Sequence, residues 1–152
     1  MKLGILKESQ GENRVAMLPE TAEALTKLKV EVMVEKDAGK TAFASDKQFE
    51  DAGAKVDSRE KVISQSDILV MIQPPSASDI KKFKDGQVIV AVFNPFFNKD
   101  IVKATAAQNL TSFSLDLVPR STRGQAMDIL SSQATVSGYK SVLAAANTMD
   151  KF

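Results

Sequence analysis

The sequence contains neither cysteine nor histidine. Without cysteine, the chain has no disulfide, no thiolate nucleophile and no zinc–thiolate site. Without histidine, it lacks the side chain that most often serves as a general acid, a general base or a metal ligand. We therefore expect no metal site. Any chemistry must use carboxylates, lysine or tyrosine, or involve no proton transfer at all.

An excess of charge of one sign is also absent, because 20 basic and 19 acidic residues leave a formal net charge of +1. This balance gives no reason to expect a nucleic acid or an acidic membrane surface as a partner. No apolar run approaches the ~20 residues of a membrane-spanning helix, and the N-terminus has no secretory signal. We expect a soluble cytoplasmic chain, whose 152 residues fit one domain with its own core.

Glycine-rich phosphate loops are missing as well. The seven glycines stand at positions 4, 11, 39, 53, 86, 124 and 138, and none of them completes a G-x-G-x-x-G fingerprint or a P-loop. The sequence therefore offers no evident cradle for a pyrophosphate.

Strand patterns and helix patterns alternate along the chain with short connections. Apolar stretches predict strands at residues 3–6, 30–34, 54–56, 68–72, 88–93 and 110–117. Helices are predicted from residue 19 to about 28, and over 45–52, 58–66, 78–83, 99–108, 122–130 and 134–149. This order predicts a doubly wound, mostly parallel sheet, a flavodoxin-like three-layer α/β/α fold that ends in a long C-terminal helix.

The stretch from Val118 to Gly138 carries the most unusual combination of side chains. It follows the last predicted strand, and ligands of open α/β sheets bind at the carboxyl ends of the strands. On a helix with ~100° per residue, one polar arc collects the amide, the carboxylate and the hydroxyls of Gln125, Asp128, Ser131 and Ser132. Such groups suit a ligand that carries hydroxyls and a carboxamide, such as a ribose with a nicotinamide.

Simpler interpretations remain open at this point. Thr122 and Gln125 fit a capping box, in which both side chains merely start the helix. The polar arc would then be a solvated helix face. Arg120 could donate two hydrogen bonds to a carbonyl, and Arg14, after the first strand, could face the same crevice, but either arginine could equally be surface charge.

The chain resembles the N-terminal part of the NAD(H)-binding alpha subunit of proton-translocating NAD(P) transhydrogenase, a family related to alanine dehydrogenase. The resemblance covers essentially the whole chain. It is carried by the opening motifs at residues 4–8 and 12–16, by Pro19, and most specifically by the segments 118–120, 125–128, 130–133 and 138–139.

The resemblance implies roles for the residues of this loop. Arg120 would contact the nicotinamide carboxamide, and Gln125 would lie between the two nicotinamides. Asp128 and Ser131 would hold the ribose and carboxamide of NAD(H), and family spacing selects Ser131 over Ser132. The cofactor-binding set is Arg120, Gln125, Ala126, Met127, Asp128 and Ser131, of which Arg120, Gln125 and Asp128 would act in catalysis.

The same resemblance implies the context. Residues 1–152 would be the N-terminal subdomain of the NAD(H)-binding component, and the family's Rossmann subdomain, which carries the glycine fingerprint, is absent from the sequence. We expect this segment alone to be inactive and to bind NAD(H) weakly or not at all. The implied partners are a membrane-embedded component, a component that binds NADP(H), and a second copy of the chain in a homodimer. The chain would be peripheral on the cytoplasmic or matrix face of the inner membrane.

Two other functions fit parts of the sequence. An alanine dehydrogenase-like enzyme needs acid–base groups, which that family supplies as a lysine after the central strand and a histidine after a later one. Here Gln73 and Asn94 stand at those places, so this alternative is weaker. A non-catalytic dimerisation module would use the small residues Gly138 and Ala144–Ala146 for close helix packing.

Overall fold

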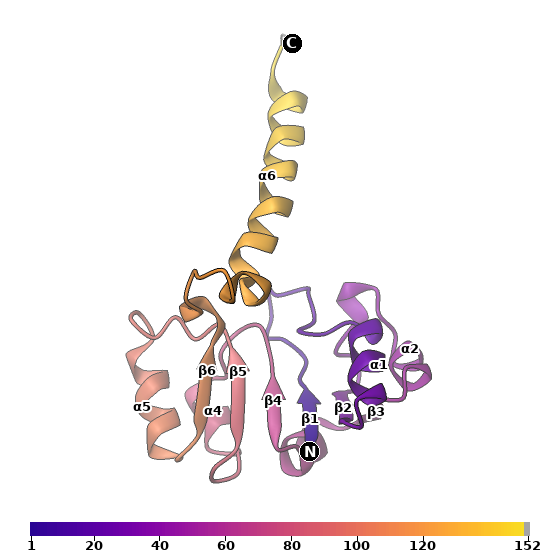
Figure 1. The fold of residues 1–152 in the computed structure, drawn as a ribbon, viewed down its shortest axis with the longest axis vertical. Helices are drawn as coiled ribbons and strands as arrows, with labels where there is room; N and C mark the ends of the chain where they lie inside the picture. The colour runs from indigo at the N-terminus through magenta and orange to yellow at the C-terminus, as the bar shows by residue number, and fades with distance from the viewer. Residues whose placement is uncertain (151–152) are drawn as a thin grey trace. The chain divides into compact units, whose positions relative to one another are not determined.

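The computed structural model describes residues 1–150 and divides into two compact units, one of residues 1–114 and one that begins at Leu115 (Figure 1). The first unit contains six strands: β1 (Lys2–Ile5), β2 (Glu31–Glu35), β3 (Lys55–Asp57), β4 (Ile68–Val70), β5 (Val88–Ala91) and β6 (Thr111–Ser114). Its helices are α1 (Pro19–Lys27), the 3₁₀ turn η1 (Lys40–Ala42), α2 (Asp46–Asp51), α3 (Arg59–Gln65), α4 (Ala77–Ile80) and α5 (Lys99–Ala107).

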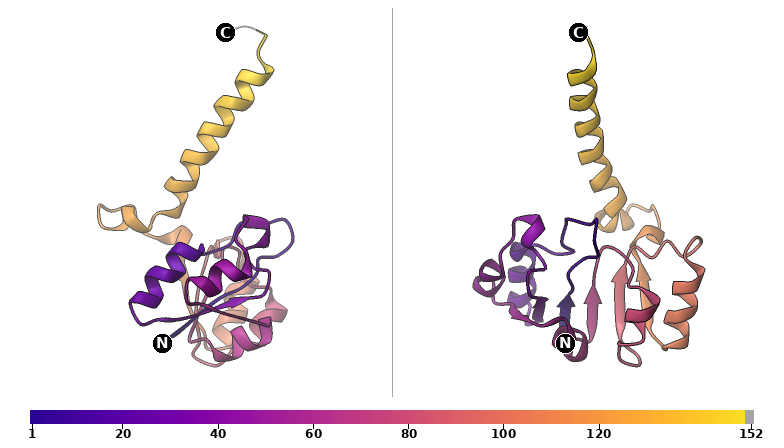
Figure 2. Two further views of the ribbon diagram at one scale, coloured as in Figure 1. Left: turned by 90° about the vertical axis from the view of Figure 1, so that its right-hand side faces the viewer. Right: turned by 180° about the vertical axis from the view of Figure 1, so that it is seen from behind.

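The six strands form one sheet in the order β3-β2-β1-β4-β5-β6, and every neighbouring pair is parallel. Figure 1 shows the strands side by side in this order, and Figure 2 shows the sheet from behind. The doubly wound α/β fold predicted from the sequence is confirmed. The strand order is that of the Rossmann type, with a third strand beyond β2 that the flavodoxin order lacks.

Helices cover the sheet on both faces, because right-handed crossovers place them on opposite sides when the strand order reverses. On one face, α1 and α2 pack on a cluster that includes Ile5, Val34 and Phe49. On the other face, α3, α4 and α5 pack on a cluster that includes Leu69 and Ile89. Successive side chains of a strand point to opposite faces, so β2 contributes Met33 to the second cluster and Val32 and Val34 to the first.

Local sequence signals explain most helix boundaries. Pro19 occupies the first turn of α1, where a missing N–H costs nothing. Ser45 begins α2 with a capping box, since its hydroxyl accepts from the N–H of Gln48 and its own N–H donates to the Gln48 side chain. The Ser58 hydroxyl caps α3 by accepting from the N–H of Lys61, and Gly53, with φ of 85°, supplies a left-handed stop after α2.

Several predicted boundaries in the first unit are wrong, among them the end of the strand predicted over 88–93, which lies at Ala91. The strand predicted over 110–117 ends at Ser114, and Leu115–Leu117 form the 3₁₀ turn η2. The strand predicted over 68–72 ends at Val70; the N–H of Met71 still donates to Val90 of β5, but that of Ile72 donates to the side chain of Glu8. The cap of α4 is Ser76 rather than Ser78, since the Ser76 hydroxyl accepts from the N–H of Asp79.

The second unit holds η2, a second 3₁₀ turn η3 (Gly124–Met127) and the long helix α6 (Ile129–Thr148). The long C-terminal helix is therefore confirmed, but its predicted division is wrong. The segment 122–130 is not a helix of its own, and α6 runs unbroken through the gap that was predicted before residue 134. The reason lies in how α6 begins, which also shapes the candidate site.

Candidate functional site

The loop of the second unit folds into a tight coil before α6. The N–H of Ser121 donates to the carbonyl of Pro119 at 2.8 Å, and the N–H of Gln125 donates to the carbonyl of Ser121 at 3.0 Å. The Ser121 hydroxyl accepts from the N–H of Gly124 at 3.2 Å. These short-range hydrogen bonds make the loop compact. Arg120, before η3, and Asp128, after it, therefore line the same pocket.

Asp128 starts helix α6. One of its carboxylate oxygens accepts from the N–H groups of Leu130 and Ser131 at 3.0 and 3.2 Å, and the other accepts from the Ser131 hydroxyl at 2.6 Å. Hydrogen bonds from the Ser131 hydroxyl, and then from the two backbone N–H groups, lower the pKa of Asp128, and the charge of Arg120 adds to this. Asp128 is therefore an ionised N-cap at pH 7.

A pocket of about 300 Å³ opens beside this cap, lined by Arg120, Ser121, Thr122, Gln125, Asp128 and Ser131. It brings together four of the six residues predicted from the sequence. The other two, Ala126 and Met127, belong to η3 and do not line it. Ser132 also lies outside the pocket, and its hydroxyl donates to the carbonyl of Ile129 within the helix.

Thr122 and Gln125 do not form the capping box that the sequence left open for them. The turn η3 (Gly124–Met127) follows Arg123 and has no side-chain cap of its own. Asp128 takes the capping role six residues later than Thr122, because an aspartate offers a charged acceptor to the free N–H groups of a helix. Gln125 is thereby released from the helix start and faces the pocket.

The pocket offers more hydrogen-bond donors than acceptors. Within residues 1–150, no hydrogen bond or ion pair that we observe engages the guanidinium of Arg120 or the carboxamide of Gln125. The Asp128 oxygen that bonds the Ser131 hydroxyl retains room for one more donor. The arrangement therefore suits a ligand with a carbonyl oxygen for Arg120 and a hydroxyl for Asp128.

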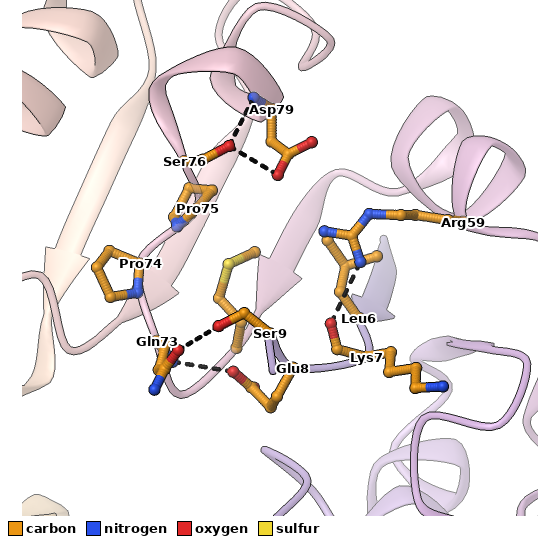
Figure 3. A pocket seen from close by; sticks show the side chains of 11 residues that line it. Leu6, Lys7, Glu8, Ser9, Arg59, Gln73, Pro74, Pro75, Ser76 and Asp79 are labelled. Atoms are coloured by element: carbon orange, nitrogen blue, oxygen red, sulfur yellow. Dashed lines mark hydrogen bonds between the residues drawn. The ribbon is translucent and has the colours of Figure 1, made fainter. Parts of the chain in front are cut away.

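The first unit has a second polar constellation, at the carboxyl ends of β1 and β4. Strand order reverses between these two strands, and ligand sites of such folds usually lie at that point. The carboxylate of Glu8 accepts from the N–H of Ile72 at 2.6 Å and from the N–H of Gln73 at 3.0 Å. The Ser9 hydroxyl donates to the side-chain carbonyl of Gln73, as Figure 3 shows.

Glu8 therefore ties the loop after β1 to the chain that leaves β4. Burial raises the pKa of Glu8, and the two backbone N–H groups only partly offset this effect. The pocket that remains beside Glu8 measures about 150 Å³ and is lined on its other side by Arg59 and Asp79 (Figure 3). Arg59 is itself engaged, since it donates to Glu35 at 2.8 Å and to the Lys7 carbonyl at 3.2 Å.

Arg14 lies in the loop after β1, as the sequence predicted, and lines a neighbouring pocket of about 340 Å³. Its guanidinium donates to both carboxylate oxygens of Glu12, at 2.9 and 2.6 Å, and its backbone N–H donates to the same carboxylate at 2.9 Å. The side-chain hydrogen bond from Arg14 is the main cause that lowers the pKa of Glu12 to about 2. Arg14 is thus oriented by Glu12 rather than left to move in solvent.

Sequence reasoning missed the roles of Glu8 and Glu12. The hydrogen bond that Glu8 accepts from the N–H of Ile72 joins residues 64 positions apart in the sequence. Only the pairing of β1 with β4 brings these two residues together. Among the described residues, no group of three or more acidic side chains is placed to hold a metal ion. No helix in residues 1–150 is long and apolar enough to cross a membrane.

Comparison with known proteins gives consistent relatives. A family model described as "Alanine dehydrogenase/PNT, N-terminal domain" matches residues 4–137. An NAD(P) transhydrogenase subunit alpha chain of Rickettsia prowazekii is 39% identical over 151 residues, which are 95% of this chain and 39% of the relative. The NAD(P) transhydrogenase subunit alpha of Haemophilus influenzae is 37% identical over 153 residues, which are 100% of this chain and 30% of the relative.

Solved structures agree with these relatives. The crystal structure of a transhydrogenase from Sinorhizobium meliloti matches with a TM-score of 0.93 and 37% identity, and covers 99% of this chain and 46% of that one. An L-alanine dehydrogenase matches with a TM-score of 0.76 over 81% of this chain and 34% of its own, but at 22% identity this likeness concerns the fold alone. The chain spans less than half the length of each of these relatives.

Proposed function

Because the chain belongs to the alanine dehydrogenase/PNT N-terminal-domain family, we propose that it is a segment of an NAD(P) transhydrogenase. This enzyme would transfer a hydride between NAD(H) and NADP(H) and couple the transfer to proton translocation across a membrane. Residues 1–152 would be the N-terminal subdomain of its NAD(H)-binding component. The pocket before α6 would hold the nicotinamide and the ribose of NAD(H).

One observation carries this assignment: one pocket combines the guanidinium of Arg120 with the carboxylate of Asp128, which keeps room for a further donor. Arg120 would donate to the carboxamide oxygen of the nicotinamide. Asp128 would accept one ribose hydroxyl at the oxygen that already bonds Ser131. Gln125 would lie between the nicotinamide of NAD(H) and the nicotinamide of NADP(H). Ala126 and Met127 would contribute only the backbone that shapes the turn.

The absence of histidine is compatible with this chemistry. Direct hydride transfer between two nicotinamides needs the two rings to be positioned against each other, and it needs no general acid or base. The dehydrogenase alternative needs proton transfer to an imine. Gln73, bonded to Ser9, and Asn94, in a left-handed turn with φ of 45°, stand where that family places its lysine and histidine, and neither amide side chain titrates.

The assignment is tested by Asp128→Asn in the full transhydrogenase complex. Asparagine retains an oxygen for the N–H groups that start α6, but it loses the charge and weakens the ribose contact. We expect the rate of hydride transfer to fall by about tenfold or more, as for loss of a charge-assisted hydrogen bond. An unchanged rate would remove this loop from the active site.

A matched pair of serines sharpens the test. Ser131 and Ser132 are neighbours in the first turn of α6, but only Ser131 lines the pocket. We expect Ser131→Ala to raise the KM for NADH, while Ser132→Ala leaves it unchanged. Equal effects of the two substitutions would point to a role in helix stability alone.

The remaining components of the enzyme follow from the same proposal. The hydride acceptor NADP(H) would bind to a partner component, and proton movement would take place in a membrane-embedded component. The chain would be peripheral, on the cytoplasmic or matrix face, and a second copy would complete a homodimer. This segment offers no glycine fingerprint for a pyrophosphate, so we expect weak or no NADH binding to residues 1–152 alone. Micromolar affinity in a calorimetric titration would contradict that expectation.

A further inference from the structure

Ser121 makes three hydrogen bonds with the main chain of the loop before α6. Its N–H donates to the carbonyl of Pro119 at 2.8 Å, and its own carbonyl accepts from the N–H of Gln125 at 3.0 Å. Its hydroxyl accepts from the N–H of Gly124 at 3.2 Å. Ser121 therefore joins the part of the loop that precedes it to the part that follows it.

These hydrogen bonds fix the main chain of residues that line the pocket. The hydrogen bond from Ser121 to Pro119 spans three residues, so Arg120 is the central residue of a γ-turn. Beyond Ser121, the carbonyl of Gln125 accepts from the N–H of Asp128 at 3.3 Å. A continuous series of main-chain hydrogen bonds thus connects the turn at Arg120 with Gln125 and with the start of α6.

The loop is closed tightly at Gly124. A Cβ atom at this position would overlap the carbonyl oxygen of Pro119, so glycine allows the two segments of the loop to touch. Gly124 is buried, although Ser121 is exposed. Removal of the Ser121 hydroxyl would therefore leave the N–H of Gly124 without its partner and with poor access to water as a replacement.

The side chains of Arg120 and Gln125 depend on this main chain for their direction. Asp128 is fixed by its own hydrogen bonds to the first turn of α6. The guanidinium of Arg120 and the carboxamide of Gln125 have no comparable hydrogen bond that we observe within residues 1–150. Because the backbone angles of a residue decide which way its side chain leaves, the contacts that hold the turn also aim these two groups.

We propose that Ser121 is a positioning residue of the nicotinamide pocket, whose hydroxyl holds the loop in the form that presents Arg120 and Gln125 to the ring. This inference rests on the proposed function, because it takes the ligand to be the nicotinamide and ribose of NAD(H). Hydride transfer between two rings is sensitive to their mutual orientation. A loosened loop therefore slows the transfer more than it weakens the binding of NADH, of which this pocket holds only one end.

Ser121→Ala in the full transhydrogenase complex tests the proposal. We expect the rate of hydride transfer to fall about fivefold, as for the loss of one capping hydrogen bond, while the KM for NADH changes less than about twofold. Ser121→Thr keeps a hydroxyl and should restore the rate to within about twofold of the wild type. A raised KM with an unchanged rate would mean that the hydroxyl contacts the ligand directly, and it would overturn the proposal. A threonine variant as slow as the alanine variant would do the same.

Ser58→Ala is the matched control. The Ser58 hydroxyl also accepts from an N–H three residues later, that of Lys61 at 3.4 Å, but it caps α3 in the first unit. We expect Ser58→Ala to lower the stability of the chain and to leave hydride transfer unchanged. Equal effects of the two alanine substitutions on the rate would assign both to stability alone and would contradict a positioning role.

Hydrogen exchange in the 152-residue chain tests the loop itself without a nucleotide. We expect the N–H groups of Gly124 and Gln125 to exchange about fivefold faster in Ser121→Ala and at the wild-type rate in Ser58→Ala. Unchanged exchange in Ser121→Ala would overturn the inference.

The kinetic results separate this inference from the function on which it rests. If Asp128→Asn leaves hydride transfer unchanged, the nicotinamide assignment fails, and the role of Ser121 fails with it. If Asp128→Asn slows the transfer and Ser121→Ala does not, only the role of Ser121 fails.

Discussion

Replacing Glu12 by glutamine tests how the loop after β1 is held. Glu12 accepts three hydrogen bonds from Arg14, two from the guanidinium and one from the backbone N–H. Glutamine keeps the shape of the side chain, but it loses the charge and one of the acceptors. We expect Glu12→Gln to lower the free energy of unfolding at pH 7 and to loosen Arg14.

The size of the effect follows from the pKa. Arg14 lowers the pKa of Glu12 from 4.5 to about 2, and at about 1.4 kcal/mol per pKa unit this corresponds to roughly 3 kcal/mol. The Arg14 side chain is 54% exposed while that of Glu12 is only 11% exposed. Solvent screening of the arginine reduces the expected loss to about 1–2 kcal/mol.

The pH dependence has a definite sign. A carboxyl whose pKa is lowered in the folded protein stabilises it above the unfolded-state pKa, and this contribution is lost as the pH falls through the folded-state value. The difference in stability between the wild-type chain and Glu12→Gln is therefore full above about pH 5. It shrinks progressively as the pH falls from there toward the folded-state value of about 2.

Urea unfolding at several pH values between 3 and 7 measures this difference, and the carboxyl carbon shift of Glu12 in an NMR titration measures the pKa directly. Glu50→Gln is the control, because we observe no ion pair of the Glu50 side chain within the described residues. A stability difference that is the same at pH 3.5 and pH 7, or a Glu12 that titrates near 4.5, would refute the reasoning.

Three further substitutions test other contacts. Ser66→Ala removes a hydroxyl that is fully buried and has no hydrogen-bond partner in the described structure, so thermal unfolding should show a gain of about 1 kcal/mol. Gln87→Leu breaks three hydrogen bonds of a buried amide, and we expect a loss of about 2–4 kcal/mol in urea unfolding. Glu8→Ala frees the N–H groups of Ile72 and Gln73, whose hydrogen exchange should then accelerate at least tenfold; unchanged exchange would contradict the contact.

Sequence patterns predicted most of the fold because the signals concerned are local. The apolar run at Val32–Val34 and the caps at Ser45 and Ser58 depend on neighbours within one turn or one strand. The start of α6 was missed because two local signals compete there. Thr122 with Gln125 matches a capping box, but Asp128 with Ser131 is the stronger acceptor for a helix start.

The candidate site was predicted only incompletely for a related reason. The polar residues from Gln125 to Ser132 are close in sequence, so a helical projection could group them, and the resemblance could select among them and add Arg120. Glu8 acts on N–H groups at the end of another strand. Its role depends on which strands are neighbours, and periodicity within β1 carries no information about that pairing.

The sheet separates the buried apolar residues of the first unit into two clusters, one on each face. The cluster with Ile5 and Phe49 lies on one face, and the cluster with Ile89 lies on the other. Side chains on opposite faces share few neighbours, so truncations such as Ile5→Val and Ile89→Val should combine additively in their effect on stability, whereas pairs within one cluster should not. A mutation that changes the packing on one face therefore needs no compensating mutation on the other. Buried positions that covary among related sequences should accordingly lie on the same face of the sheet.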